Sequence, residues 1–321
     1  MAAKGLFFLL IFVFCNLPLY SAGTTSAPLL NFLPSPRINA MAGSGVSVPG
    51  NFNTSAANPA LLGSLEGSSA SALFYNSFMD SGLGYLAYCR ELGPGSMSVE
   101  LVEYFGGKIT IEDSEGRHEG LHGKKLSAQR DTILSLGYGR RFFAPETYGG
   151  IKIRYYSSTL LEDYKASNVS ADAGVFVRTL FFKTGYPNLL SRPYSPGMGA
   201  GFSLRNIGSS ISYLSKAESD PLPLSVRAGL SYPLRFDAEN AFLISADFIY
   251  KPNNDIIRGG IGVEYENSGM FFLRGGYMLN YEIKNFTWGL GVRHGKLQLD
   301  YSMGLTSAIN SEHTFMFKMD F

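Results

Sequence analysis

The chain of 321 residues has few charged side chains, few cysteines and little sign of helical periodicity. Lys, Arg, Asp and Glu make up 17% of it, against about 25% in typical soluble domains. The 27 basic and 26 acidic side chains nearly cancel, which argues against electrostatic binding of nucleic acid. Glycine, with 37 residues, and aromatic residues, at 14%, are plentiful instead. This composition favours a β-protein with tight turns and a wide apolar surface.

Cysteine occurs only at Cys15 and Cys89, and Cys15 falls in an apolar leader. Lys4 is followed by eleven uncharged residues, GLFFLLIFVFC, and then by small residues. Residues 1–23 are therefore expected to be a secretory signal peptide, cleaved after Ala22 or Gly23. The apolar run is too short to span a bilayer, which takes about 20 residues, and the bulky Phe14 disfavours lipidation of Cys15. Cleavage leaves Cys89 alone, so no internal disulfide is expected.

Long apolar runs are absent after residue 23, which excludes a transmembrane helix there. Apolar and polar residues alternate with period two instead, as in PLPLSVRAGLSY, NAFLISADFIY and KLQLDYSM. Alternating segments of about ten residues separated by turns are typical of a transmembrane β-barrel. We count about fourteen such segments from residue 70 to Phe321. The sequence therefore predicts an all-β fold, an antiparallel transmembrane barrel over residues 70–321. An exported soluble β-sandwich remains the alternative.

Charged residues recur on one face of these segments, where a barrel turns them inward. They are Arg154, Arg227, Asp247, Glu264, Arg274, Arg293, Asp300 and Lys318. Such charges are expensive in hydrocarbon, whereas in a water-filled lumen they are tolerated and opposite signs can pair. We therefore expect a wet lumen lined by these residues.

The last nine residues, HTFMFKMDF, place large apolar side chains at alternate positions. Phe315, Phe317, Met319 and Phe321 share one face of an extended strand. This pattern resembles the C-terminal signal read by outer-membrane insertion machinery. The final strand is thus expected to be both part of the wall and a targeting signal.

Residues 24–69 are rich in small and polar residues and lack sustained alternation, which predicts a hatch or plug at the barrel mouth. Residues 113–129 are strongly polar, and residues 184–197 carry three prolines. Both stretches are expected to be loops.

Several blocks of the sequence, in order, resemble the PorV/PorQ-type outer-membrane proteins, relatives of the FadL long-chain fatty acid transporters. The N-terminal block closes on the Asn-Pro-Ala motif, Asn58, Pro59 and Ala60. Further blocks are SADAGVFVRT, GFSLRNIG, PLPLSVRAGLSY, GGIGVEYENSGMFFLRGGY and EHTFMFKMDF. The family usually has an acidic residue before the Asn-Pro-Ala motif, where this chain has Asn51 and Asn53.

This resemblance implies a fourteen-stranded barrel in a bacterial outer membrane, with the N-terminal segment folded into the lumen. FadL relatives take up hydrophobic molecules, whereas some PorV relatives hold proteins during secretion and surface attachment. We expect passive uptake of hydrophobic small molecules such as long-chain fatty acids. A secretion partner and a structural or adhesive surface protein remain alternatives. The expected partners are membrane lipid, insertion machinery and a hydrophobic ligand, and the expected state is a monomer.

No stretch of the sequence favours enzyme chemistry. His118 and His122 have the spacing of a helical zinc site, but Gly120 between them disfavours a helix. Gly197 to Gly201 form a GxGxG pattern, but more strand is expected after it rather than the helix that a phosphate site needs. None of the four histidines lies in a nucleophile motif. We therefore expect no catalytic residues, no metal and no cofactor.

Overall fold

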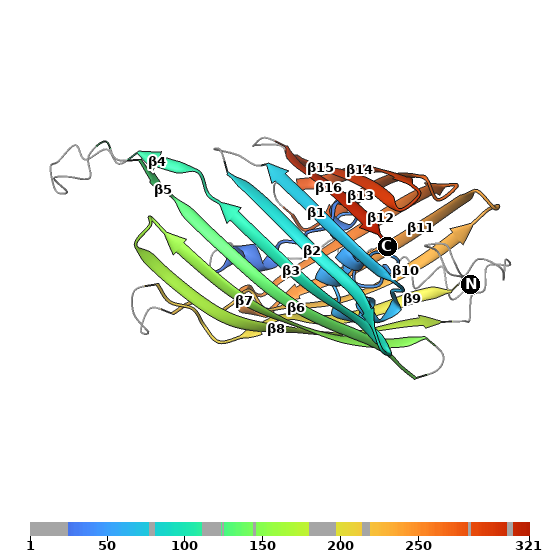
Figure 1. Ribbon diagram of the computed structural model, residues 1–321, viewed down its shortest axis with the longest axis horizontal. Helices are drawn as coiled ribbons and strands as arrows, with labels where there is room; N and C mark the ends of the chain where they lie inside the picture. Colours follow the sequence, from blue (N-terminus) through green and yellow to red (C-terminus); the bar gives the residue numbers. More distant parts are fainter. Residues whose placement is uncertain are drawn as a thin grey trace.

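Fourteen antiparallel strands close into one barrel in the computed structural model (Figure 1). The structure describes residues 25–76, 81–110, 123, 125–143, 146–179, 197–213, 219–281, 284–306 and 311–321. The expected signal peptide, His118, His122 and most of the two expected loops lie outside these residues. The strand number and the fold class match the prediction.

The strands follow one another around the wall in chain order. They are β1 (Ser68–Asn76), β2 (Gly82–Leu92), β3 (Gly95–Phe105), β6 (Gln129–Phe143), β7 (Thr147–Leu160), β8 (Tyr164–Thr179), β9 (Met198–Gly208), β10 (Ser225–Arg235), β11 (Asn240–Lys251), β12 (Ile256–Asn267), β13 (Phe271–Leu279), β14 (Lys284–His294), β15 (Leu297–Thr306) and β16 (Glu312–Asp320). The pairing of β1 with β16, with Phe74 opposite Phe315, closes the barrel. β4 (Lys108–Thr110) and β5 (Lys125–Ser127) form a separate two-stranded sheet. β4 lies just before the expected polar loop of residues 113–129, and β5 is a short strand in its last part.

The barrel has two distinct ends. We name the end where β1 begins and β16 finishes the base, and the opposite end the mouth. At the base, the connections are short turns, such as those from Leu92 to Gly95 and from His294 to Leu297. The connection between β8 and β9 is the one long connection at this end. At the mouth, long connections follow Phe105 and Gly208.

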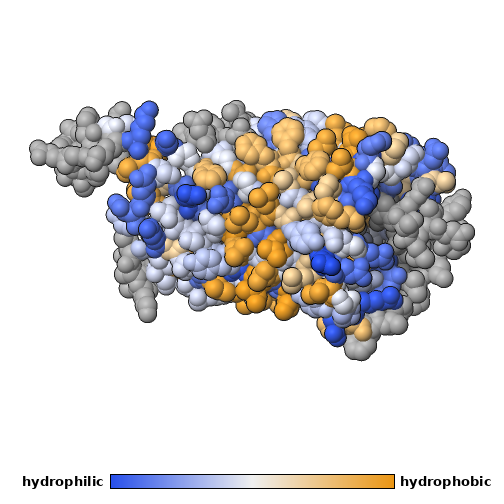
Figure 2. Space-filling model, viewed as in Figure 1, coloured by the Kyte–Doolittle hydropathy of each residue, from blue (hydrophilic) through white to orange (hydrophobic). Residues whose placement is uncertain are grey.

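Apolar side chains on the outside of the wall gather in a band across the middle of the face shown in Figure 2, with more hydrophilic residues toward both ends. In β16, Phe315 and Phe317 are 56% and 43% exposed, while Thr314, Met316 and Lys318 between and beside them are buried. Soluble proteins rarely expose so large an apolar area, and lipid is the environment that suits it. The alternative of a soluble sandwich is therefore wrong.

The chain before β1 lies inside the barrel as a series of short helical turns, seen in blue in Figure 1. They are η1 (Pro28–Asn31), α2 (Pro36–Ala40), η2 (Phe52–Ala56) and η3 (Pro59–Ser64). Ser35, Asn51 and Asn58 cap the last three, since their oxygens accept a backbone N–H that the helix start leaves free. We name residues 25–67 the hatch. None of the helices among the described residues is long and apolar enough to cross a bilayer.

The hatch fills space that the sequence assigned to water. Ile38, Met41, Val46 and Leu61 of the hatch are buried at 0% exposure. The inward-facing charges of the wall, such as Lys152 at 1% exposed, are therefore covered by protein. The expectation of a wet lumen is wrong for this part of the barrel, because the N-terminal segment replaces the water.

Glycines in the strands make room for the hatch. Gly150 of β7 faces the backbone of Pro59 and Ala60, and Gly276 of β13 faces Met41 and Ala42. A methyl group at Gly276 would lie 2.5 Å from the backbone nitrogen of Ala42. The glycine content, attributed to turns from the sequence, therefore also serves this close approach of two backbones.

Candidate functional site

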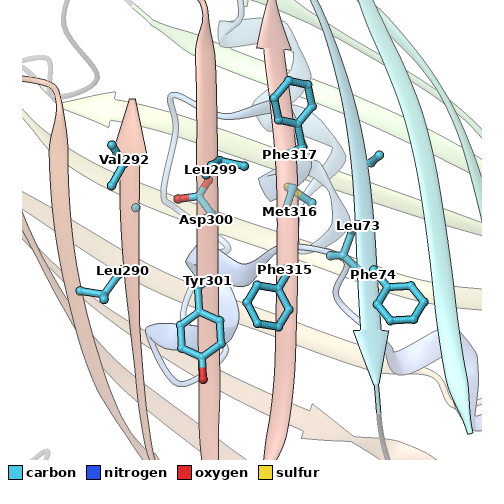
Figure 3. Close-up of a pocket in the computed structure, with 12 residues that line it drawn as sticks. Leu73, Phe74, Leu290, Val292, Leu299, Asp300, Tyr301, Phe315, Met316 and Phe317 are labelled. Carbon is cyan, nitrogen blue, oxygen red and sulfur yellow. The ribbon is translucent and has the colours of Figure 1, made fainter. Parts of the chain in front are cut away.

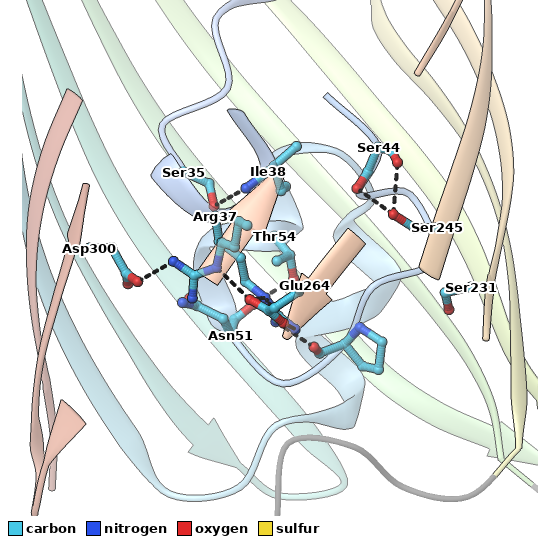
Figure 4. Close-up of polar contacts among 12 residues, drawn as sticks. Ser35, Arg37, Ile38, Ser44, Asn51, Thr54, Ser231, Ser245, Glu264 and Asp300 are labelled. Carbon is cyan, nitrogen blue, oxygen red and sulfur yellow. Dashed lines mark hydrogen bonds and ion pairs between the residues drawn. The ribbon is translucent and has the colours of Figure 1, made fainter. Parts of the chain in front are cut away.

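A chain of buried ion pairs joins the hatch to the wall on the base side (Figure 4). Arg37 of α2 donates through Nη2 to Glu264 of β12 at 2.6 Å, and through Nη1 to the carbonyl oxygen of Pro49 at 2.8 Å. Arg274 of β13 donates to Glu264 at 2.5 Å and to Asp300 of β15 at 2.5 Å. We name Arg37, Glu264, Arg274 and Asp300 the base network.

The base network continues along the wall. Gln298 donates to the free oxygen of Asp300 at 2.7 Å, and Arg293 donates to Gln298 at 2.5 Å. Lys318, the eighth charged residue predicted to face inward, is buried and pairs with Asp320 at 2.9 Å. Each charge of the base network, together with Arg293 and Lys318, therefore has a partner of opposite sign or a hydrogen-bonding amide. Nearby, one carboxylate oxygen of the buried Glu266 has no hydrogen-bond partner.

Asp247 of β11 holds the hatch through its backbone. One of its carboxylate oxygens accepts the N–H groups of Gly45 at 2.8 Å and Val46 at 3.0 Å. Next to it, the hydroxyls of Ser44 and Ser245 share a hydrogen bond of 2.8 Å (Figure 4). These contacts fix the central loop of the hatch against β11.

The Asn-Pro-Ala motif sits against the opposite wall. The Asn58 side chain accepts the N–H of Ala60 at 3.0 Å, which starts η3, and Pro59 follows at the first position of that turn. The Asn58 amide also donates to the carbonyl oxygens of Val46 at 2.8 Å and Val175 at 3.0 Å. One side chain thus joins two parts of the hatch and strand β8.

Asn51 and Asn53, which stand where the resemblance leads one to expect an acidic residue, make neutral contacts. Asn51 caps η2 by accepting the N–H of Asn53 at 2.9 Å. The Asn53 side chain accepts from Ser71 at 3.1 Å and donates to the sulfur of Met316 at 2.8 Å. Amides here satisfy hydroxyl and sulfur partners without bringing in another charge.

On the mouth side, the wall contains a bulge between β8 and β9. The pairing skips from Ala171–Ile207 to Ala173–Leu204, so two residues of β9 face Asp172. Asn206 adopts a left-handed conformation with φ of 61°, and its N–H donates to Asp172 at 2.8 Å. Arg154 forms an ion pair with the other oxygen of Asp172 and donates to the Leu30 carbonyl at 3.0 Å.

Two further arginines near the mouth have fewer partners. Arg205 of β9 donates to the Leu30 carbonyl at 3.1 Å, and Arg227 of β10 makes a long contact of 3.4 Å with the Gly43 carbonyl. Both side chains are buried. The Nε and Nη1 groups of Arg205 and the Nε group of Arg227 have no hydrogen-bond acceptor.

A cavity of about 210 Å³ lies at the mouth between hatch and wall. Its apolar lining includes Phe32 and Leu33 of the hatch and Ile249, Met278 and Met303 of the wall. Its polar lining includes Asn31, Asn39, Arg227, Tyr281, Glu312 and Thr314. The cavity is therefore small and combines apolar and polar side chains in similar measure.

The larger hollows described on the molecule lie outside the wall. One of about 460 Å³ is bounded by Phe74, Leu290, Leu299 and Phe315 (Figure 3). These side chains belong to the exposed apolar surface, so the hollow faces lipid and is separate from the interior.

The predicted residues thus fall into three groups. Arg154, Arg227, Asp247, Glu264 and Arg274 contact the hatch or residues that hold it, whereas Arg293, Asp300 and Lys318 contact other wall residues. Phe315, Phe317 and Phe321 are exposed on the outside. Sequence reasoning missed Arg37 and Arg205, since a single arginine in an unpatterned segment or at a strand end carries no recognisable signal. Among the described residues, no group of three or more His, Cys, Asp or Glu side chains is placed to bind a metal.

The wall, its apolar exterior and the filled interior define a membrane-spanning β-barrel plugged by its own N-terminal segment. No protein-family model matches the chain, and no curated protein matches its sequence. Solved structures with the same fold do exist.

These solved structures are transport channels rather than enzymes. The Pseudomonas putida toluene transporter TodX shares a TM-score of 0.57 and 13% identity, over 88% of this chain and 95% of that one. The CymD monoaromatic hydrocarbon channel has a TM-score of 0.56 and 11% identity, over 89% of this chain and 97% of that one. A Pseudomonas aeruginosa FadL homologue has a TM-score of 0.50 and 11% identity, over 95% of this chain and 100% of that one. Identities this low show a shared fold, within which the likeness to PorV and PorQ specifically stays a prediction.

Proposed function

We propose that this protein is an outer-membrane channel for the passive uptake of hydrophobic small molecules. The observation that carries the proposal is the cavity at the mouth, where apolar side chains of hatch and wall face one another. Its position under the mouth suits a first binding place for a molecule that enters from outside. The fold that it shares with hydrocarbon channels supports this reading.

The size of the cavity limits what it holds in its resting state. A closed apolar cavity of about 150 Å³ binds benzene, so the 210 Å³ at the mouth accommodates one aromatic ring or a short stretch of acyl chain. A long-chain fatty acid, the substrate that the resemblance to FadL relatives implies, fits only when the hatch moves. We therefore rank single-ring hydrocarbons before fatty acids as substrates.

The inward charges serve in this proposal to hold the hatch. Glu264 and Asp247 bind it directly, and Asn58, Pro59 and Ala60 anchor it to β8. Phe315, Phe317, Met319 and Phe321 serve for insertion into the outer membrane. The longer connections at the mouth place it outside the cell, since barrels of this kind have short turns on the periplasmic side.

The test is uptake of radiolabelled toluene by cells that express the protein, compared with a strain that lacks it. Met278→Trp fills the cavity and is expected to lower the uptake rate severalfold, because Met278 lines it. Tyr277→Trp is the matched control, since Tyr277 lies one residue earlier and 40% exposed on the outer face. Equal uptake with and without the protein would refute the proposal.

A second function, a partner in protein secretion, is favoured by the filled interior. The hatch occupies the lumen on the base side, as expected of a scaffold that conducts nothing. Crosslinking in intact cells tests it, because a scaffold should trap a secretion-machine subunit or an exported protein. Toluene uptake that requires the protein, without such crosslinks, would decide for the channel.

A further inference from the structure

Two arginines at the mouth carry buried N–H groups without acceptors. Arg205 is 0% exposed, and its Nε and Nη1 atoms have no hydrogen-bond partner. Arg227 is 6% exposed, and its Nε atom has none. Buried donors of this kind are rare, because a buried charged group without a hydrogen-bond partner carries an uncompensated desolvation cost.

The nearby carboxylates do not balance these arginines. Asp172 is paired with Arg154 and lies 4.0 Å from the Nε of Arg205. Asp247 uses one oxygen for the hatch backbone, and its other oxygen makes no hydrogen bond. Glu100 also acts on Arg205 but is already paired with Lys152 at 2.5 Å. The four basic groups Arg154, Lys152, Arg205 and Arg227 thus outnumber the carboxylates Asp172, Asp247 and Glu100 by one.

Further groups around the two arginines add donors and positive charge. Ser225 is the direct partner of Arg205 across β9 and β10, and its buried hydroxyl has no partner. Lys251 of β11 and Arg258 of β12 bring more positive charge from the next strands. Two N–H groups of Arg205, one of Arg227 and the hydroxyl of Ser225 thus outnumber the one unpartnered oxygen of Asp247. The missing group is therefore a further acceptor of hydrogen bonds with a negative charge.

The space available sets the size of that group. Arg227 lines the mouth cavity, which gives access from solvent, whereas Arg205 behind it is fully enclosed. Arg205 and Arg227 are diagonal neighbours on adjacent strands, so their Cα atoms lie about 7–8 Å apart.

We propose that Arg205, Arg227 and Ser225 bind one small monovalent inorganic anion, of halide size, at the inner end of the mouth cavity. The anion accepts the unpartnered N–H and O–H groups and neutralises the excess charge. It also links wall strands β9 and β10 to the hatch, since both arginines already donate to hatch carbonyls. The proposal stands independently of the transported substrate.

Thermal unfolding of the full chain in detergent tests the proposal. The midpoint is expected to rise by a few degrees, saturably, when bromide or chloride replaces a bulky organic sulfonate at constant ionic strength. Arg205→Met should abolish this rise. Arg178→Met is the matched control and should keep it, because Arg178 pairs with Glu146 at the base, away from the site.

Crystals of the unmodified protein in bromide give a second measurement that does not depend on the folding of a variant. Anomalous scattering should show one peak between Arg205 and Arg227. Absence of both the peak and the halide-specific rise would overturn the proposal. Displacement of bromide by an equal concentration of octanoate would also overturn it, because the site would then belong to the head group of an amphiphilic cargo.

Discussion

The base and the mouth of the barrel both contain buried arginines, but only those of the base network have a full set of partners. At the base, Arg37 and Arg274 share the carboxylate of Glu264, and Asp300 completes the set. At the mouth, Arg205 and Arg227 keep buried N–H groups without acceptors. A fully satisfied network fixes one structure, whereas an incomplete one is unstable until another group completes it. The comparison therefore assigns the base to holding the hatch and the mouth to binding.

The largest expected effect comes from breaking the base network at its centre. Glu264→Gln removes the charge that Arg37 and Arg274 share, and leaves two buried cations with a neutral amide and Asp300. Removing one partner of a buried ion pair costs about 3–5 kcal/mol. We expect the free energy of unfolding in urea to fall by about this amount, as followed by the mobility of the folded barrel on gels.

The control for this variant is an exposed ion pair. Glu103 and Arg130 approach to 3.8 Å with largely exposed side chains, and such pairs contribute about 0–1 kcal/mol. Glu103→Gln should therefore leave the unfolding curve almost unchanged. Equal effects of the two variants would show that the base network does not hold the structure.

A smaller effect is expected from two adjacent glycines of β13. Gly276→Ala places a methyl group against the backbone of Ala42 in the hatch, whereas the same group at Gly275 meets no atom within 4 Å. Overpacking of this kind costs about 1–3 kcal/mol. We expect Gly276→Ala to destabilise the barrel and to increase protease cleavage within residues 36–48, with Gly275→Ala at or slightly above the unmodified stability.

Either protease result of this pair is informative. Cleavage raised by Gly276→Ala alone would show that the close contact between hatch and wall exists in the dissolved protein. Cleavage raised equally by both substitutions would mean that glycine in this strand serves conformation rather than close approach.

The sequence was sufficient to predict the wall, because the alternation in strands such as β16 is a local property. Phe315 and Phe317 face outward while Thr314 and Lys318 are buried, as period two requires. β1 begins at Ser68, whereas the division of the chain at residue 70 stays a prediction. Strand existence and facing follow from side-chain chemistry alone.

The interior was harder to predict, because its contacts join residues far apart in the chain. Arg37 meets Glu264, 227 positions later, and no period in either segment indicates that pair. The glycines facing the hatch look like turn residues until the hatch backbone is in place. The polar lumen was expected to be wet for the same reason, since the sequence shows charges but not what covers them.

A smaller expected effect concerns the anchor at Asn58. Asn58→Asp keeps the oxygen that accepts the N–H of Ala60 and removes the amide that donates to Val46 and Val175. Asn58→Ala removes both, and the loss of a helix cap alone costs about 1 kcal/mol. If the donations to Val46 and Val175 hold the hatch, Asp should destabilise at least as much as Ala in urea unfolding. If only the cap matters, Asp should behave as the unmodified protein.

The smallest effect is expected at Asp237, an exposed carboxylate in the base turn between β10 and β11. It accepts the N–H groups of Glu239 at 2.8 Å and Asn240 at 2.7 Å. The side-chain amide of Asn240, together with these two N–H groups, holds the pKa of Asp237 below its ordinary value, which is about 3.9 in an unfolded chain. The lowered pKa stabilises the folded protein at pH values above the pKa of the unfolded chain. This stabilisation is lost as the pH falls through the pKa of Asp237 in the folded protein.

Asp237→Asn therefore removes a pH dependence of the free energy of unfolding that is confined to pH values below about 4. An NMR titration of the Asp237 carboxyl group should give a midpoint below that of a model peptide, and unfolding at neutral pH should hardly change. The exposed carboxylate exchanges its protein partners for water at little cost, whereas Glu264 has no water to replace Arg37 and Arg274. Finding an ordinary pKa at Asp237 would mean that the turn does not hold these bonds in solution, and the contrast between covered and exposed carboxylates would then rest on Glu264 alone.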